Sequence, residues 1–468
     1  MPHSYIALGL RHDKSDWNHG CTQINTDKNE GGWNALLRNF GPDMNISSDR
    51  AKNLLRAFII QSLVLLFVLS VLTCVPLRSQ TPAPAASQAA PAAHTLTGID
   101  VLESESFAPL VGKRVGLITN QTGLDHQGRS TIDLLAHAPG VKLVALFSPE
   151  HGIRGAVDER VASSKDEATG LPVYSLYGET LRPTDEMLAG LNALVFDIQD
   201  AGVRFYTYIT TLGYVMEAAA AHHIPLYILD RPDPLGGERI EGPMLDRDRT
   251  NFVGYFPMPV RMGMTLGEMA KMFNVQKVIK CDLHVIRLQN WQRRFLFDDT
   301  GLLWVNPSPN LRSPAAGILY PGLEILQAGG VSVGRGTEHP FELVGAPWIH
   351  GDEFSVYLNH RAIPGVRFEA AKFTPDTGLY KGEPCEGVKV VLTDRAALQS
   401  MLMGLEIASA LKKIYPGKFD SAKMIELVGN AATIQQLVEG KDPAAIAASW
   451  TKDLQAFRLL RAKYLIYQ

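Results

Sequence analysis

The chain has 468 residues, with 48 acidic and 45 basic side chains and a formal net charge of −3. This balance excludes a nucleic-acid-binding protein that relies on bulk positive charge. Hydrophobic residues make up 46% of the chain and charged residues 20%. That composition is typical of a globular protein with one large or two medium-sized domains, and it excludes a disordered, collagen-like or multi-span membrane protein.

The first 98 residues differ from the rest of the chain. Residues 1–43 are polar and show no periodicity, so we expect a disordered extension that precedes a true start at Met44. Residues 44–80 have the order of a secretory signal, because basic residues precede an apolar run at 57–75 and small polar residues follow it. Residues 81–98 are an Ala- and Pro-rich linker that cannot bury a core.

The apolar run at 57–75 has a second interpretation. Its 19 residues are just long enough to span a bilayer as a single uncleaved anchor. Both interpretations export the rest of the chain to the periplasm or beyond, either free or anchored to the inner membrane. Cys281 and Cys385 then form one disulfide or remain two buried thiols. N-terminal sequencing of the exported protein tests the start, and an intact N-terminus at Met1 would contradict it.

From residue 99 onward, short β-branched runs alternate with helical stretches. In chain order we predict a strand at 114–119, a helix at 130–137, strands at 142–147 and 193–198, a helix at 206–222 and a strand at 225–229. Strands separated by helices indicate a parallel sheet with helices on both faces. The fold class predicted for this part is therefore α/β, with a doubly wound sheet.

The pattern changes after about residue 245. We predict a helix at 265–273, strands at 282–288 and 387–393, and helices at 396–415, 424–439 and 443–465. The body is therefore divided into a doubly wound domain at 99–245 and a smaller C-terminal α/β domain at 246–468.

The second predicted strand runs directly into the sequence SPEHG at 148–152. Open α/β sheets bind their ligands at the carboxyl ends of the strands. Glu is a poor helix cap and a poor turn former, yet Glu150 lies between a Pro and a His-Gly pair. We therefore predict a catalytic role for Glu150, with His151 beside it.

The next two strands end in further polar groups at the same edge of the sheet. Asp residues also cap helices and pair with Arg in loops, and for Asp230 with Arg231 such a structural role is the favoured alternative. The substrate-binding candidates from this edge are Asp200, Arg204, Tyr206, Tyr208, Arg231 and Asp233.

Glu217 lies on the predicted helix at 206–222, next to Met216 and several Ala residues. This composition favours a tightly packed helix face, although a solvated position is the alternative. A carboxyl group among apolar atoms has its pKa raised, as a general acid needs. Glu217 is therefore the second candidate catalytic carboxylate, and Asp197, Asp200 or Asp233 could take its place.

Two clusters in the second half combine amide, guanidinium, carboxylate and aromatic groups. An Arg pairs a carboxylate with two parallel hydrogen bonds, and a Trp packs on the face of a sugar, so these groups suit a carbohydrate that carries a carboxylate. An ordinary interdomain loop is the alternative. The binding candidates from these clusters are Asn306, Arg335, Glu342 and Trp348.

Several chemistries lack their usual motifs. The chain has no glycine-rich dinucleotide fingerprint after the first strand, no phosphate-binding P-loop, no zinc-binding HExxH helix and no GxSxG nucleophile elbow. We expect no cofactor and no metal. Acid-base chemistry by carboxylates remains.

Five ordered motifs carry a resemblance to a known family: LFSPEHGIRG at 146–155, FDIQDAGVRFYTY at 196–208, LDRPDPLGG at 229–237, IEGPML at 240–245 and SVGRGTEHPFELVGAPW at 332–348. They resemble the NamZ-type exo-β-N-acetylmuramidases, and the likeness runs from about residue 99 to the end. The resemblance implies a Rossmann-like domain joined to a smaller α/β domain, with the site between them. It also implies release of N-acetylmuramic acid from the non-reducing ends of peptidoglycan fragments, with Glu150 and Glu217 as the matching glutamates.

Glycoside hydrolysis normally uses two carboxyl groups that flank the scissile bond. We hypothesise that Glu150 is the acid, tuned by His151, that Glu217 is its partner, and that Arg335 binds the lactyl carboxylate of muramic acid. Retention, inversion and substrate assistance all remain open. The alternative functions are a non-catalytic muropeptide-binding envelope protein and an exo-N-acetylglucosaminidase.

Overall fold

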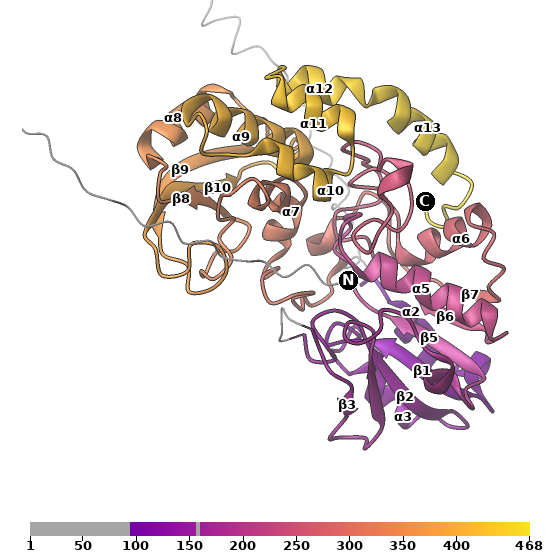
Figure 1. Cartoon of the computed structure of the whole chain (residues 1–468). Coiled ribbons are helices and arrows are strands. Elements are labelled where there is room, and N and C mark those ends of the chain that lie inside the picture. Colours follow the sequence, from indigo (N-terminus) through magenta and orange to yellow (C-terminus); the bar gives the residue numbers. More distant parts are fainter. Residues whose placement is uncertain (1–93, 156–159) are drawn as a thin grey trace, which may run out of the picture. The chain divides into compact units, whose positions relative to one another are not determined.

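The computed structural model describes residues 94–155 and 160–468 (Figure 1). The predicted extension at 1–43, the predicted signal or anchor at 44–80 and most of the predicted linker lie outside these residues. Within the described part of the chain, no helix is long and apolar enough to cross a membrane.

A seven-stranded sheet is the core of the first part of the described chain, and its strand order is β3-β4-β2-β1-β5-β6-β7. Every neighbouring pair is parallel except β3 and β4, which are antiparallel. The predicted α/β class with a mostly parallel sheet is therefore confirmed. The strands are β1 (Arg114–Thr119), β2 (Lys142–Ser148), β3 (Ser164–Lys165), β4 (Pro172–Ser175), β5 (Ala193–Asp197), β6 (Leu226–Leu229) and β7 (Leu283–Ile286).

Helices cover both faces of this sheet, because its buried strands present apolar side chains to both sides. On one face, Leu117 packs in a core with the residues of α2 (Gly98–Ser104) and α3 (Thr131–Ala136). On the other face, Ile118 packs in a second core with α5 (Tyr208–Ala221) and α6 (Leu266–Gln276). Figure 1 shows α5 and α6 beside β5, β6 and β7, and the short α4 spans Asp185–Leu188.

The second part of the described chain has a three-stranded antiparallel sheet in the order β8-β10-β9, packed with helices. The predicted strand at 387–393 is its central strand. The elements of this part are α7 (Pro314–Gln327), β8 (Leu343–Ala346), α8 (Gly351–His360), β9 (Val366–Phe373), β10 (Cys385–Leu392), α9 (Ser400–Ile414), α10 (Ile425–Val428), α11 (Ala431–Val438), α12 (Pro443–Ser449) and α13 (Thr451–Arg461).

Two predicted long helices are each divided in two. The helix predicted at 424–439 breaks at Gly429, which is left-handed with φ 63°, and Asn430 then caps α11 by accepting from the Thr433 amide at 2.9 Å. The helix predicted at 443–465 breaks at Trp450. The boundary expected near residue 245 does not coincide with the end of the first sheet, since β7 at 283–286 is its last strand.

The two cysteines of the described chain are free and buried. Burial raises the pKa of the Cys281 thiol to about 12 and that of the Cys385 thiol to about 11. Both side chains therefore stay protonated at neutral pH and act as small core residues.

The side chain of Arg204, which follows β5, joins the first part of the body to α10. It is fully buried, and its guanidinium donates to the main-chain oxygens of Pro243, Met258, Leu427 and Val428 at 2.8–3.1 Å. Burial lowers the pKa of Arg204 to about 9. Four long-range carbonyl contacts make Arg204 a structural bridge between segments more than 200 positions apart.

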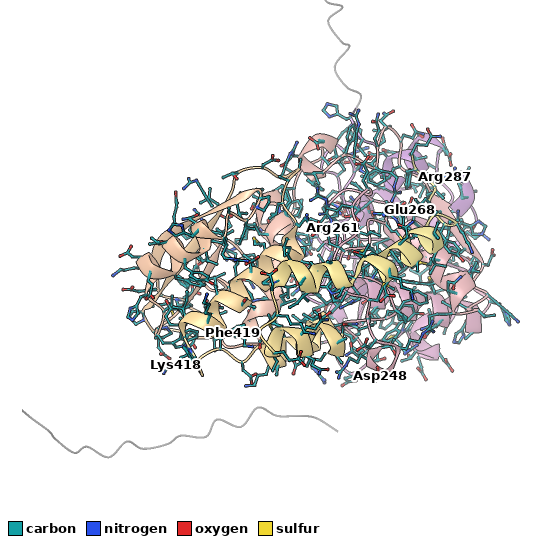
Figure 2. All side chains as sticks on the ribbon, turned by 90° about the horizontal axis from the view of Figure 1, so that it is seen from above. Asp248, Arg261, Glu268, Arg287, Lys418 and Phe419 are labelled. Carbon is teal, nitrogen blue, oxygen red and sulfur yellow. The ribbon has the colours of Figure 1, made fainter. Side chains whose placement is uncertain are left out.

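A second junction lies along α13 and the C-terminal tail. Arg461 donates to the carbonyls of Gly237, Met262 and Gly263 at 2.7–3.1 Å. Glu268, labelled in Figure 2, accepts from Arg293 at 2.7 Å and from the Ile466 amide at 2.9 Å. The last helix is thereby bonded to the loop that follows β6, and the tail after it is bonded to α6.

We predict that Arg204→Met lowers the free energy of unfolding by about 3 kcal/mol or more, since four buried carbonyls lose their donor while most of the side-chain volume stays. Urea unfolding measures the change. The control is Arg249→Met. The Arg249 side chain is 42% exposed and its ion pair with Asp246 is long at 4.0 Å, so we expect this change to alter the free energy of unfolding by less than about 0.5 kcal/mol. Equal changes in the two variants would contradict the structural role of Arg204.

Candidate active site

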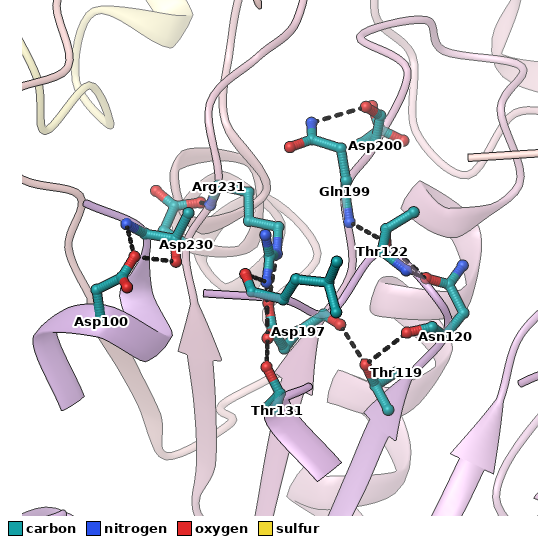
Figure 3. Close-up of polar contacts among 12 residues, drawn as sticks. Asp100, Thr119, Asn120, Thr122, Thr131, Asp197, Gln199, Asp200, Asp230 and Arg231 are labelled. Atoms are coloured by element: carbon teal, nitrogen blue, oxygen red, sulfur yellow. Dashed lines mark hydrogen bonds and ion pairs between the residues drawn. The ribbon is translucent and has the colours of Figure 1, made fainter. Parts of the chain in front are cut away.

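Asp197 and Arg231 form an ion pair at the carboxyl edge of the sheet (Figure 3). Arg231 donates to both carboxylate oxygens of Asp197 at 2.5 and 2.9 Å and to the Leu124 carbonyl at 2.7 Å. Asp197 also accepts from Thr131 at the start of α3. This bidentate pair locks the ends of β5 and β6 together.

Asp230, at the end of β6, is also enclosed by donors. Its carboxylate accepts from Thr265 at 2.7 Å, from the Gly267 amide at 2.9 Å and from the Tyr467 hydroxyl at 2.6 Å. These bonds attach α6 and the C-terminal tail to the sheet. The Arg231 guanidinium pairs with Asp197, and the Arg231 main-chain amide donates to Asp230 Oδ1 at 3.1 Å; these contacts are the kind that the structural alternative expects.

A cavity of about 220 Å³ lies just beyond the end of β2. Three well-separated segments of the chain contribute predicted site residues to its wall. These residues are Glu150, His151, Tyr206 and Arg335. Its lining residues are Glu150, His151, Phe205, Tyr206, Thr207, Val253, Ser308, Tyr320, Glu324, Arg335 and Leu427.

The turn after β2 places Glu150 at the cavity wall. His151 and Gly152 both have positive φ, 70° and 76°, so the chain reverses sharply directly after Glu150. Thr207, the residue before the first turn of α5, donates its hydroxyl hydrogen bond to Glu150 Oε2 instead of capping its own helix. Glu150 is therefore held near the positive end of α5.

A second carboxylate, Glu324, lines the same cavity and was missed by the sequence analysis. It lies on α7, which begins with Ser313 as N-cap, accepting from the Ala316 amide at 3.0 Å, and Pro314 in the first turn. Arg335 donates to Glu324 Oε1 at 2.9 Å, and the Arg335 guanidinium lies 5.0 Å from the ring centre of Phe341. The Ser-Pro pair at 313–314 was the available signal for the helix, but no local signal marks which face of it meets the cavity.

Aromatic rings form one wall of the cavity. Tyr320 packs edge-on against Phe205 and Tyr206, with ring centres 5.7 and 6.0 Å apart. Burial raises the pKa of Tyr206, and the nearby Asp200 and Glu150 act in the same direction, so Tyr206 keeps its phenolic proton. Tyr208 lies beneath this wall, donating to the Pro307 carbonyl at 2.6 Å and accepting from Asn120 at 3.0 Å.

Asp200 and Asp233 are two buried carboxyl groups in the loops that follow β5 and β6. Asp200 accepts from the Gly202 amide at 2.7 Å and Asp233 from the Leu235 amide at 2.9 Å. Within the described residues, the other oxygen of each has no hydrogen-bond partner. Burial raises the pKa of Asp200 to about 8, with Asp233 adding to the rise, and burial raises the pKa of Asp233 to about 6. Neither side chain lines the cavity of Glu150.

Glu217 lies outside this cavity. Its carboxylate accepts from Arg182, from the Tyr255 hydroxyl at 2.7 Å and from Lys277 at 3.1 Å. Burial acts to raise the pKa of Glu217, but these hydrogen bonds outweigh it and lower the pKa below its usual value. The expected rise in the pKa of Glu217 is therefore wrong, because two cations reach it from segments distant in sequence.

The remaining predicted binding residues also lie away from the cavity lining. The side chain of Trp348 donates to the Tyr380 hydroxyl at 3.2 Å and packs edge-on against Tyr415. Glu342 is 3.8 Å from His339 and 3.9 Å from Lys389. Asn306 is exposed and contributes its main-chain oxygen to Gln121 at 2.7 Å.

One group of side chains in the described chain has the composition of a metal site: Asp100, Asp125 and His126. His126 and Asp100 bond to each other at 2.6 Å, and Thr97 donates to the second oxygen of Asp100 at 2.7 Å. Arg129 donates to both oxygens of Asp125. Because protein donors already surround these carboxylates, the group fits a structural hydrogen-bond network better than a cation.

Two carboxyl groups line one cavity beside aromatic rings, and glycoside hydrolysis normally uses two carboxyl groups that flank the scissile bond. The model of the family described as exo-beta-N-acetylmuramidase NamZ matches with its N-terminal part at residues 115–315 and with its C-terminal part at residues 318–467. The chain belongs to this NamZ family of glycoside hydrolases. The family resemblance predicted from the five motifs is therefore confirmed.

The chain is also similar to individual proteins of known sequence or structure. The chain is 44% identical over 376 residues to the peptidoglycan beta-N-acetylmuramidase NamZ of Bacillus subtilis (strain 168). The aligned region covers 79% of this chain and 91% of that protein. Two crystal structures of DUF1343 family proteins from Bacteroides fragilis are also similar. One has a TM-score of 0.75 at 38% identity and the other a TM-score of 0.66 at 29% identity. Each match covers 80% of this chain and 99% of the B. fragilis chain.

We predict that Asp200 makes the folded protein less stable as pH rises from about 6 to 8. The pKa of Asp200 is about 8 in the folded protein and 3.8 normally, so in this window the native state holds a proton that the unfolded chain has lost. Asp200→Asn should flatten the slope by up to about 1.4 kcal/mol per pH unit. Urea unfolding at several pH values measures it, with the exposed Asp376→Asn as control; identical slopes in wild type and Asp200→Asn would contradict this prediction.

Proposed function

We propose that this protein releases N-acetylmuramic acid from the non-reducing ends of peptidoglycan fragments and that Glu150 and Glu324 are its paired carboxylates. The observation that carries this proposal is their position in one cavity of about 220 Å³. Family membership supports the substrate, since the B. subtilis relative is named for action on peptidoglycan. Glu217, our sequence-based choice for the second carboxylate, has weaker support because it lies among cations outside the cavity.

The surroundings of the two carboxylates suggest different roles. Glu324 is ion-paired with Arg335 at 2.9 Å, which suits a carboxylate that acts in its ionised form as a base or nucleophile. Glu150 accepts from the uncharged Thr207 hydroxyl, whereas Glu324 accepts from a cation, so Glu150 is the candidate to protonate the leaving oxygen. We therefore assign Glu150 as the acid, as the sequence analysis did, and Glu324 as its partner.

Arg335 remains the candidate for the lactyl carboxylate of muramic acid. It lines the cavity and brings positive charge next to Glu324. A sugar without the lactyl group would lose this charge pairing. The proposed location is outside the cytoplasm, where the leader at 44–80 and a peptidoglycan substrate would place the enzyme.

The function is tested by comparing a β-muramide with the matching β-glucosaminide. We expect the wild-type protein to hydrolyse the MurNAc-GlcNAc disaccharide and muramyl fluoride and to turn over the glucosaminides at least about 10²-fold more slowly, because only the muramides carry the lactyl carboxylate. Product release is measured by chromatography. Binding without any product would instead favour the non-catalytic muropeptide-binding alternative, and equal rates would favour the exo-N-acetylglucosaminidase.

The same substrates separate the roles of the carboxylates. Glu150→Gln should reduce turnover of the disaccharide by about 10³-fold or more but affect muramyl fluoride far less, since fluoride leaves without protonation. Glu324→Gln should reduce turnover of both substrates. Glu217→Gln is the contrasting variant and should keep turnover of muramyl fluoride, which lacks the second sugar, within about threefold of wild type; loss of muramyl fluoride turnover in that variant but not in Glu324→Gln would restore Glu217 as the partner of Glu150.

A further inference from the structure

Three partly exposed aromatic rings, Tyr177, Phe252 and Tyr214, lie in a row. Tyr177 and Phe252 are stacked, with ring centres 5.8 Å apart and an interplanar angle of 25°. Phe252 and Tyr214 follow at 6.1 Å. We call these three rings the aromatic platform. Neither the paired carboxylates nor the cavity wall accounts for them.

The aromatic platform and Glu150 lie at the same edge of the sheet, as the strand register shows. Ser148 of β2 is the partner of Ser175 of β4, and the Leu176 amide donates to the Ser148 carbonyl at 2.8 Å. Glu150 and Tyr177 are each two residues beyond this pair, so the two neighbouring strands deliver them to the same edge of the sheet. Phe252 directly precedes Val253, which lines the cavity.

Charged groups border the platform. The Arg182 guanidinium lies 3.6 Å from the ring centre of Tyr214 and bonds to Glu217, which is three residues after Tyr214 on α5. A cation over an aromatic face is an attractive contact, and the ion pair fixes the position of Arg182. Glu217 therefore positions a donor at the edge of the platform.

Tyr214, one of the three rings, is held by the residues packed against it. Tyr214 packs edge-on against Tyr255 at 5.9 Å, and Tyr255 packs against Phe273 of α6 at 4.9 Å. The Tyr255 hydroxyl donates to Glu217 at 2.7 Å. A surface that is already ordered loses little conformational entropy when a ligand binds to it.

We infer that the aromatic platform binds the sugar ring on the leaving-group side of the scissile bond, the ring that follows the muramic acid residue. This inference rests on the proposed function and deepens it. A sugar ring presents a face of C–H groups that packs on an aromatic ring, while its hydroxyls need donors and acceptors at the rim. Tyr177 and Phe252 supply the face, and Arg182 supplies the donor.

The test compares a substrate that has this second sugar with one that lacks it. Tyr177→Leu and Phe252→Leu should each raise KM for the MurNAc-GlcNAc disaccharide about tenfold, while kcat and KM for muramyl fluoride stay within about twofold of wild type. Tyr177→Phe keeps the ring and should keep the wild-type KM. Phe295→Leu is the matched control, since Phe295 is a partly exposed ring 5.4 Å from the Arg294 guanidinium and is not part of the cavity lining.

The possible outcomes are distinct. An unchanged KM for the disaccharide in both Leu variants, or an equal loss on both substrates, would overturn the platform assignment while leaving the proposed function intact. Failure of the wild-type protein to cleave either muramide would overturn the proposed function itself. If a Leu variant unfolds, disaccharide binding to Glu150→Gln is compared with and without Tyr177→Phe and Phe252→Tyr, which keep the rings; a tenfold loss of binding in these variants would contradict stacking.

Discussion

The buried guanidinium of Arg204 is the constraint on which the geometry of the site depends. It donates to carbonyls of Pro243 and Met258 and, more than 200 residues later, to those of Leu427 and Val428. Phe205, Tyr206 and Thr207 directly follow it and line the cavity, and Leu427 lines the cavity from the other segment. A single fully buried side chain thus fixes two walls of the cavity to each other. Because its contacts are all carbonyls, Arg204 is a structural residue of the site, although the sequence pattern predicted it to bind substrate.

The cavity brings together functional side chains from parts of the chain that are distant in sequence. The parallel sheet delivers Glu150 at the end of β2. Helix α5 supplies Thr207 to hold Glu150, and α7 supplies Glu324 with Arg335 against it. The edge of the sheet positions one carboxylate, and a helix from the second half of the chain positions the other. Both parts of the body therefore contribute to the proposed site.

Much of the fold could be predicted from the sequence, because the buried strands are continuous apolar runs: β1, β2 and β5 lie within one residue of their predicted bounds. The position of Glu150 at the cavity was predictable because a Pro and a His-Gly pair isolate it after a strand. Glu324 was not, since it lies inside an apolar helical stretch whose cavity-facing side depends on packing. The environment of Glu217 was not predictable either: Arg182 is 35 positions away and Lys277 is 60, and only the folded chain shows that these cations reach it. The breaks at Gly429 and Trp450 depend equally on local geometry that periodicity does not reveal.

The central claim is that Glu150 and Glu324 flank the scissile bond. A crystal structure of Glu150→Gln with bound MurNAc-GlcNAc tests it most directly. The account predicts that the glycosidic oxygen lies within hydrogen-bond distance of the side chain at position 150, with Glu324 on the opposite side of the sugar. The separation of the two groups would then indicate the stereochemistry, about 5–5.5 Å for retention and about 6.5–9.5 Å for inversion. A disaccharide bound with its glycosidic oxygen against Glu217, or away from both Glu150 and Glu324, would contradict the account.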